Sequence, residues 1–395
     1  MNDIINPIES YYKYITNWRK IMKKIGLSFF TLIIVLGFFS LPVHAKSYEE
    51  NGFRYSVKNK KAYIKGSTIQ SDTLDIPDTI NGFRVVGIGS RAFYKCTYKT
   101  ISIPESVKYI GYGAFRKSVK LKSIKLPSKM KILQSDTFQD CTKLTDVTLN
   151  KNVQEIEDSA FKNCVSLQKI IIPDSVKTIE GNAFDSCYKL TSVRLGKNVK
   201  EIGIRAFYKN YNLKSITLPS KLQTIKDSAF AKCSELVKVK FKNKNTTLGT
   251  SVFIQCKSLN KVVLPANMKS IPESTFAECT GIKSVTLPSK VTIIKKNAFK
   301  FCSLLKTVKL NTKVYAIGDR AFAYSGLKTI KLNENMQYIG NGAFQGTKIK
   351  DIKLGSKVTF IGNRVFADCR KLKKIYIPVS VKGINPGAFN NCISL

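Results

Sequence analysis

Cysteine is the residue type with the most chemical potential in this 395-residue chain, which contains ten cysteines. Each of them lies three residues after a phenylalanine. They are Cys96, Cys141, Cys164, Cys187, Cys233, Cys256, Cys279, Cys302, Cys369 and Cys392. Ser118, Asn210, Ser325 and Thr347 take the same position after four further phenylalanines. These side chains are small and can form hydrogen bonds. The pattern favours a buried column of small polar side chains over thiol chemistry, with disulfide bridges or a metal as the alternatives.

Residue types that usually perform catalysis are scarce. His44, the single histidine, lies in a segment that we expect to be removed, so the remaining chain lacks the usual near-neutral base. No Cys-x-x-Cys pair suggests zinc and no GxxxxGK[ST] loop suggests phosphate binding. Acidic residues such as Asp158, Asp227 and Asp319 recur in turns, where a structural role is usual. We therefore expect no enzymatic activity, no cofactor and no metal.

The phenylalanines that precede these cysteines reveal the organisation of the chain. They are Phe93, Phe115, Phe138, Phe161, Phe184, Phe207, Phe230, Phe253, Phe276, Phe299, Phe322, Phe344, Phe366 and Phe389. Ten of the thirteen intervals are 23 residues and three are 22. A constant period of this length indicates a solenoid, in which each residue class returns to the same place on every coil.

One repeat, LKSITLPSKLQTIKDSAFAKCSE from Leu213, shows how a coil is built. Its first apolar residues have the spacing of a strand, which Pro219 ends by removing a hydrogen-bond donor. Leu222 and Ile225 point back into the coil, and Ala229-Phe230 fills its interior. The rest of the coil is too short for more than one helical turn, so we expect short β, 3₁₀ or irregular segments there. The predicted core column includes Phe230, Cys233, Phe253, Cys256, Phe276 and Cys279.

These residues resemble the 23-residue repeats of BspA-type bacterial surface proteins, LxxIxLPxxVxxIxxxAFxxCxx, over residues 74–395. The resemblance implies a β-rich leucine-rich-repeat solenoid of about fourteen coils of 22–23 residues. A parallel β-sheet would form one face, and short irregular or 3₁₀ segments the other. It also implies a location on a bacterial surface or outside the cell, with adhesion to host matrix proteins, other bacteria or mucosal surfaces. The cysteine follows the phenylalanine, whereas the commonest leucine-rich repeats have Asn or Cys soon after the strand.

The N-terminus has the pattern of an exported protein. Residues 1–21 are unpatterned and are interpreted as an over-extended start. Residues 22–45 read as a signal peptide, with a basic start, an apolar stretch and a cleavage site between Ala45 and Lys46. An uncleaved membrane anchor is the alternative, and it would be the only contact with a membrane. We expect a secreted or extracellular protein that is associated with the cell surface or free.

The two ends of the solenoid are expected to differ. Residues 46–73 interrupt the repeat, and two alternating segments on either side of Lys58-Asn59-Lys60 predict a β-hairpin that caps the first coil. Leu395 falls on the first residue of a fifteenth strand. The sequence therefore predicts no C-terminal cap and a truncated reading frame.

The predicted sheet is rich in positive charge. Residues 46–395 contain 61 basic and 24 acidic residues, a net charge of +37. Two outward positions flank the central residue of each of thirteen strands, and ten of these 26 positions are basic while Asp146 and Asp351 are acidic. The basic residues are Lys125, Lys169, Arg194, Lys238, Lys240, Lys261, Lys309, Lys331, Lys353 and Lys374. Lys309, Lys331 and Lys353 share one column and are the sharpest candidates for a binding surface.

This charge has two interpretations. Lysine could simply keep the sheet soluble, or it could form a basic track for an acidic partner. The second interpretation predicts binding to a host extracellular-matrix protein, an acidic polysaccharide or an anionic wall polymer of the bacterium. An architectural wall or biofilm component without a specific receptor is the alternative function. A dedicated nucleic-acid role is not expected, because Tyr376 is the only aromatic residue among the outward positions.

Overall fold

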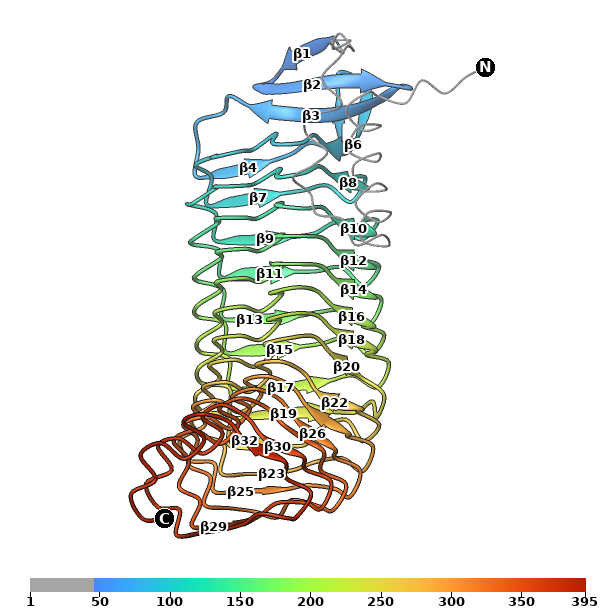
Figure 1. Cartoon of the computed structure of the whole chain (residues 1–395). Coiled ribbons are helices and arrows are strands. Elements are labelled where there is room, and N and C mark those ends of the chain that lie inside the picture. The colour runs from blue at the N-terminus through green and yellow to red at the C-terminus, as the bar shows by residue number, and fades with distance from the viewer. Residues whose placement is uncertain (1–45) are drawn as a thin grey trace, which may run out of the picture. The chain divides into compact units, whose positions relative to one another are not determined.

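The computed structural model of the chain describes residues 46–395. The predicted over-extended start and signal peptide, including Ala45 of the cleavage site, lie outside the described residues. Lys46 is exposed and precedes the first strand. Residues Glu49–Leu395 form one compact unit, in which a succession of strand, corner and turn is repeated along the stack (Figure 1).

The N-terminal end of the stack contains the three longest strands of the described residues, β2 (Phe53–Lys58), β3 (Lys61–Ser67) and β6 (Phe83–Ile88). Its other strands are β1 (Ser47–Glu50) and β5 (Thr79–Ile80). The antiparallel hairpin of β2 and β3 lies where the sequence predicts it, and β3 pairs in parallel with β6. A second antiparallel hairpin, β5 with β6, was not predicted. Buried Tyr55 and Ile64 cover the first apolar layer of the stack.

A parallel ladder of short strands forms one side of the coils, as predicted. The strands are β4 (Thr73–Asp75), β7 (Thr100–Ser102), β9 (Ser123–Lys125), β11 (Asp146–Thr148), β13 (Lys169–Ile171), β15 (Ser192–Arg194), β17 (Ser215–Leu218), β19 (Lys238–Phe241), β21 (Lys261–Val262), β23 (Ser284–Thr286), β25 (Thr307–Lys309), β27 (Thr329–Ile330), β29 (Asp351–Lys353) and β31 (Lys374–Tyr376). Each central residue is turned inward and its neighbours outward, because side chains alternate along a strand. We refer to the outward side as the strand face.

The next side of the coils is a second parallel ladder of two-residue strands. They are β8 (Tyr109–Ile110), β10 (Ile132–Leu133), β12 (Glu155–Ile156), β14 (Thr178–Ile179), β16 (Glu201–Ile202), β18 (Thr224–Ile225), β20 (Thr247–Leu248), β22 (Ser270–Ile271), β24 (Ile293–Ile294), β26 (Ala316–Ile317), β28 (Tyr338–Ile339), β30 (Phe360–Ile361) and β32 (Gly383–Ile384). Of the three predicted alternatives for this wall, short β and irregular segments occur in residues 46–395, and 3₁₀ helix does not.

The third side is a tight turn around each repeat phenylalanine, which we name the phenylalanine turn. In the coil of Phe207, N–H groups donate to carbonyls three residues earlier, as from Tyr208 to Arg205 (3.0 Å). The intervening N–H groups donate to the next coil, as from Phe207 to Ala229 (2.8 Å). Arg205 and Lys209 have positive φ values of 54° and 58°. The alternation lets the turn satisfy its own hydrogen bonds and join the coils at the same time.

The core is continuous from coil to coil. The fourteen repeat phenylalanines form thirteen stacked pairs, such as Phe184–Phe207 with ring centroids 5.2 Å apart and planes 2° apart. Leucine, isoleucine and valine from both ladders surround this column.

Residues 46–395 contain no helix long and apolar enough to cross a membrane.

The stack is not uniform. Neither ladder of hydrogen bonds is continuous, and the strand ladder is interrupted between β21 and β23. The coils drawn in orange and red, beyond β20, turn away from the direction of the earlier coils (Figure 1). The coil that contains β20 departs from the repeat pattern, because Phe241-Lys242 replaces Leu-Pro and Asn245 takes the position of Leu222 in the coil before. The neighbouring Thr246 is buried instead.

Candidate functional site

The structure places all ten predicted basic residues of the strand face in exposed positions. The parallel register brings some of them together. Lys238 of β19 lies opposite Lys261 of β21, and the two are neighbours in one column. Lys125, Lys169 and Arg194 lie opposite polar or apolar residues instead. Charge is therefore concentrated in parts of the face and diluted in others.

The predicted column of Lys309, Lys331 and Lys353 lies in three consecutive coils of the C-terminal half. Lys353 forms an ion pair with Glu334, with 3.9 Å between its Nζ and the carboxylate, and both side chains are well exposed. An exposed pair at this distance contributes little, about 0–1 kcal/mol. The column therefore remains available to an acidic ligand.

A second lysine column on the same face was missed from the sequence. Only the two positions that flank each central residue were considered there, and these lysines lie one position earlier. They are Lys283, Lys306, Lys328, Lys350 and Lys373. All five are exposed. Backbone hydrogen bonds link them from coil to coil, as from Lys306 N to Lys283 O (2.9 Å) and from Lys328 N to Lys306 O (2.9 Å). Their constant spacing of 22–23 residues was the signal that could have found them.

Tyr376 continues the column of Lys309 after Lys353, which is its partner in the register of β29 and β31. Its ring is 49% exposed. The Nζ of Lys374 lies 4.8 Å from the ring centroid. A hydrogen bond with Tyr376, with a smaller contribution from Asp351, raises the pKa of Lys374. This end of the face therefore combines positive charge with an exposed aromatic ring.

Two shallow hollows interrupt the surface. One has a volume of about 470 Å³ and lies where the strand ladder breaks, between Lys261-Val262 and Ser284. Val263, which is 58% exposed, lines it together with Thr286 of the next coil, so the surface here is largely uncharged. The other, of about 540 Å³, lies between the two ladders and is lined by Lys108, Lys129 and Lys131 with uncharged neighbours.

The cysteines lie in one interior column and are free thiols. Eight of them are buried, while Cys96 and Cys392 near the ends are partly exposed. The thiol donates to the carbonyl oxygen of the phenylalanine one coil earlier, as from Cys233 Sγ to Phe207 O (3.2 Å). Asn210 Nδ2 makes the same bond to Phe184 O (2.9 Å), whereas Ser325 Oγ has no recorded partner.

Burial also makes these thiols poor nucleophiles. It raises the pKa of Cys302 to about 12 and that of Cys369 to about 11. Burial likewise raises the pKa of Cys233, further still. Because the thiolate is the reactive form, these side chains stay protonated and inert at neutral pH. The burial and the low reactivity of these cysteines are those of core residues.

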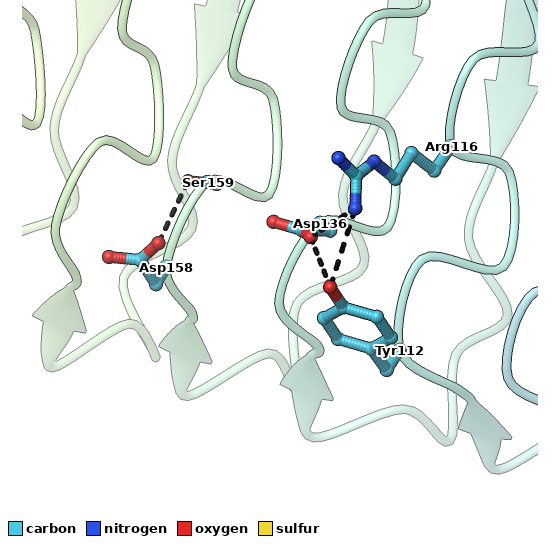
Figure 2. Close-up of polar contacts among 5 residues, drawn as sticks. All are labelled: Tyr112, Arg116, Asp136, Asp158 and Ser159. Carbon is cyan, nitrogen blue, oxygen red and sulfur yellow. Dashed lines mark hydrogen bonds and ion pairs between the residues drawn. The ribbon is translucent and has the colours of Figure 1, made fainter. Parts of the chain in front are cut away.

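A polar cluster where the second ladder meets the phenylalanine turns contains Tyr112, Arg116 and Asp136 (Figure 2). Tyr112 donates to Asp136 Oδ2 (2.6 Å), and Arg116 Nη1 donates to the same oxygen (3.1 Å). Burial, together with the hydrogen bond and charge of Asp136, raises the pKa of Tyr112. In the following coil Asp158 accepts a bond from Ser159 (2.8 Å). The contacts of Asp136 with Tyr112 and Arg116 join neighbouring coils, and the raised pKa keeps the Tyr112 phenol protonated, which suits a structural clamp.

Residues 46–395 contain no group of three His, Cys, Asp or Glu side chains arranged to hold a metal ion. The predicted core residues Phe230, Phe253 and Phe276 are almost completely buried, together with the cysteine that follows each of them. The predicted binding residues are therefore exposed along the strand face, whereas the predicted core residues are buried in the phenylalanine turns.

Comparisons with known proteins agree with this architecture. The profile of the BspA type leucine rich repeat region matches residues 72–188, 154–283 and 269–395. A leucine-rich repeat protein from Bacteroides ovatus is similar over 88% of this chain and 93% of its own, with 29% identity and a TM-score of 0.80. A leucine rich cell surface protein from Faecalibacterium prausnitzii is similar over 89% and 93%, with 26% identity and a TM-score of 0.56. No curated protein sequence matches. The chain belongs to the family of BspA-type leucine-rich repeat proteins.

Proposed function

We propose that this chain is a secreted or cell-surface binding protein that uses its strand face to hold acidic ligands, and that it is not an enzyme. The observation that carries the proposal is the strand face itself, with ten exposed basic and two acidic residues at its 26 outward positions. The family and the surface location named for the Faecalibacterium prausnitzii protein support a role outside the cell.

The physical argument rests on repulsion within the lysine columns. Neighbouring coils are ~4.8 Å apart, so lysines in one column repel each other unless an anion lies between them. An acidic ligand relieves this repulsion. A face of fourteen coils is on the order of 65 Å long, which suits polymers and large proteins. Host matrix proteins, acidic polysaccharides and anionic wall polymers are the partners that fit, and adhesion is the role that follows.

Reversing the charge of one column tests this proposal. Lys309, Lys331 and Lys353 changed together to Glu should weaken retention of the chain on heparin and on anionic wall polymer. All three side chains are exposed, so the fold should be unaffected. Retention is measured by the salt concentration needed for elution, and folding by circular dichroism. Unchanged elution of a folded variant from both columns would remove the strand face as the binding surface.

Salt separates this function from the architectural alternative. A wall component held only by diffuse charge should dissociate at moderate ionic strength, because the Debye length falls to ~8–10 Å at 0.10–0.15 M. A shaped binding surface should retain part of its affinity. Complete loss of wild-type binding between about 0.15 and 0.5 M salt, where the Debye length is shorter still, would favour the architectural role.

A further inference from the structure

The basic residues are not spread evenly over the strand face. In each coil we consider the two outward positions that flank the central residue and the exposed position before them. In the last four coils, eight of these twelve positions are lysine and one, Asp351, is acidic. In the ten earlier coils, ten of thirty are basic and three are acidic. We name the eight lysines the lysine tract. They are Lys306, Lys309, Lys328, Lys331, Lys350, Lys353, Lys373 and Lys374.

The lysine tract has two edges. Lys306, Lys328, Lys350 and Lys373 form its outer edge. The inner edge is the column of Lys309, which lies three residues further along each strand and therefore ~10 Å away. All of these side chains are exposed. The tract is thus a strip with positive charge on both sides.

The column between the two edges has no net charge, because its one acidic residue offsets its one lysine. Thr307 and Thr329 are exposed and occupy paired positions in β25 and β27. Asp351 and Lys374 follow in the same column and are also paired. Threonine hydroxyl groups can donate and accept hydrogen bonds with an uncharged part of a ligand. The middle of the strip therefore offers polar contacts and not a third row of charge.

The strip remains continuous where the strand ladder is interrupted between β27 and β29. The rings of Phe344 and Phe366 stack beneath it with centroids 5.6 Å apart. Lys348 N donates to Leu327 O across the same step (2.9 Å). Four coils extend the strip by ~15 Å along the stack. At its far end Tyr376 presents an exposed ring beside Lys374.

We propose that the lysine tract is a binding site for a sulfated polysaccharide that runs along the stack. This proposal rests on the proposed function and assigns one ligand class to one part of the strand face. A sulfated glycan carries anions on both sides of a ribbon of sugar rings, which matches lysines on two edges. Its hydroxyl groups suit the threonine column, and an aromatic ring can pack against the apolar face of a sugar. A polyphosphate chain has charge but neither hydroxyl groups nor apolar faces.

Two variants of the full chain that remove four charges each test this assignment. The first changes the outer edge, with Lys306→Gln, Lys328→Gln, Lys350→Gln and Lys373→Gln. The control changes the same face in earlier coils, with Lys122→Gln, Lys125→Gln, Lys169→Gln and Arg194→Gln. We expect the first variant to bind a heparin oligosaccharide about tenfold more weakly or worse, since several charge contacts are lost together, and the control to change about threefold or less. Affinities are measured by calorimetry at fixed salt.

Competitors distinguish the ligand class. Polyphosphate and double-stranded DNA, matched to heparin in anionic charge, should compete more weakly with the oligosaccharide, and Tyr376→Ala should lower heparin affinity without changing polyphosphate affinity. The assignment to sulfated polysaccharides would be overturned if either polymer competed as well as heparin, or if the two four-residue variants lost heparin affinity equally. The proposal that the strand face binds acidic ligands would still stand. If the charge-reversed Lys309, Lys331 and Lys353 variant binds both heparin and anionic wall polymer unchanged, the proposed function itself fails.

Discussion

At each phenylalanine turn two buried residues stabilise the stack in different ways. Phenylalanine contributes apolar area and ring stacking, and each ring between the two ends of the column stacks on one ring above and one below, as Phe230 does. The cysteine contributes a small side chain whose thiol donates a hydrogen bond to a carbonyl oxygen of the preceding coil. Ser118 makes the same type of bond, from its Oγ to Phe93 O (2.8 Å). The slot therefore selects size and hydrogen bonding, and thiol reactivity plays no part in it.

Removing one ring should leave a cavity. Phe230 is fully buried, with ring centroids 5.2 Å from Phe207 and 5.7 Å from Phe253. Phe230→Ala should lower the free energy of unfolding by about 3–5 kcal/mol, from the lost burial and the residual cavity. Urea unfolding followed by circular dichroism measures this change. Phe301→Ala is the matched control, since Phe301 is 41% exposed and stacks on Tyr324 at the surface. It should lower the free energy of unfolding by less, about 0.5–1.5 kcal/mol, and an equal loss in both variants would contradict the role of the buried column.

At the scale of the element, the phenylalanine turn depends on residues with positive φ. The position two residues before the phenylalanine has positive φ in every coil, yet glycine occupies it only at Gly113, Gly342 and Gly387. Serine, asparagine, aspartate and arginine fill it elsewhere. The hydrogen bonds within the turn and to the next coil compensate for the strain of an L-residue in this conformation.

A β-branched residue should make this strain evident. Ser251 has φ of 55°, and its N–H donates to Glu273 O (2.9 Å). Ser251→Val should lower the free energy of unfolding by about 1–3 kcal/mol, because a β-branched side chain strongly disfavours positive φ. Ser251→Gly should be neutral or stabilising, as the three natural glycines suggest. A valine variant as stable as the glycine variant in thermal melts would show that the turn tolerates any side chain there.

Sequence reasoning predicted those elements whose residues repeat with a strong pattern. The strand ladder, the inward phenylalanine and the interior cysteine column follow from a period of 22–23 residues and from alternation. The second ladder was only one of three alternatives, because strands of two residues, such as Thr224–Ile225, are too short to show alternation. The β5–β6 hairpin was missed because Phe83 and Val85 resemble residues of an ordinary coil. The outer lysine column lies beyond the strand positions that alternation identifies.

At the scale of the whole molecule, charge and stacking oppose each other. Parallel register places equivalent residues of successive coils in columns. Stacking of the phenylalanine rings stabilises the fold, whereas repulsion between the lysines of one column destabilises it. Residues 46–395 carry a net charge of +37, and ion pairs such as Lys226 with Glu201 offset only a small part of it. The same geometry therefore produces both a stable core and a surface that gains from binding anions.

Added salt should consequently stabilise the whole stack. The Debye length is ~30 Å at 0.01 M salt and ~3 Å at 1 M, and lysines of one column are only ~4.8 Å apart. Raising sodium chloride over this range should therefore raise Tm, which calorimetry measures directly. The variant with Lys306, Lys328, Lys350 and Lys373 changed to Gln should have a higher Tm at low salt and a smaller increase with salt, because four repelling charges are gone. A Tm that is independent of salt, or equal increments in the two proteins, would show that the lysines are too far apart to repel, and the electrostatic argument for anion binding would lose its basis.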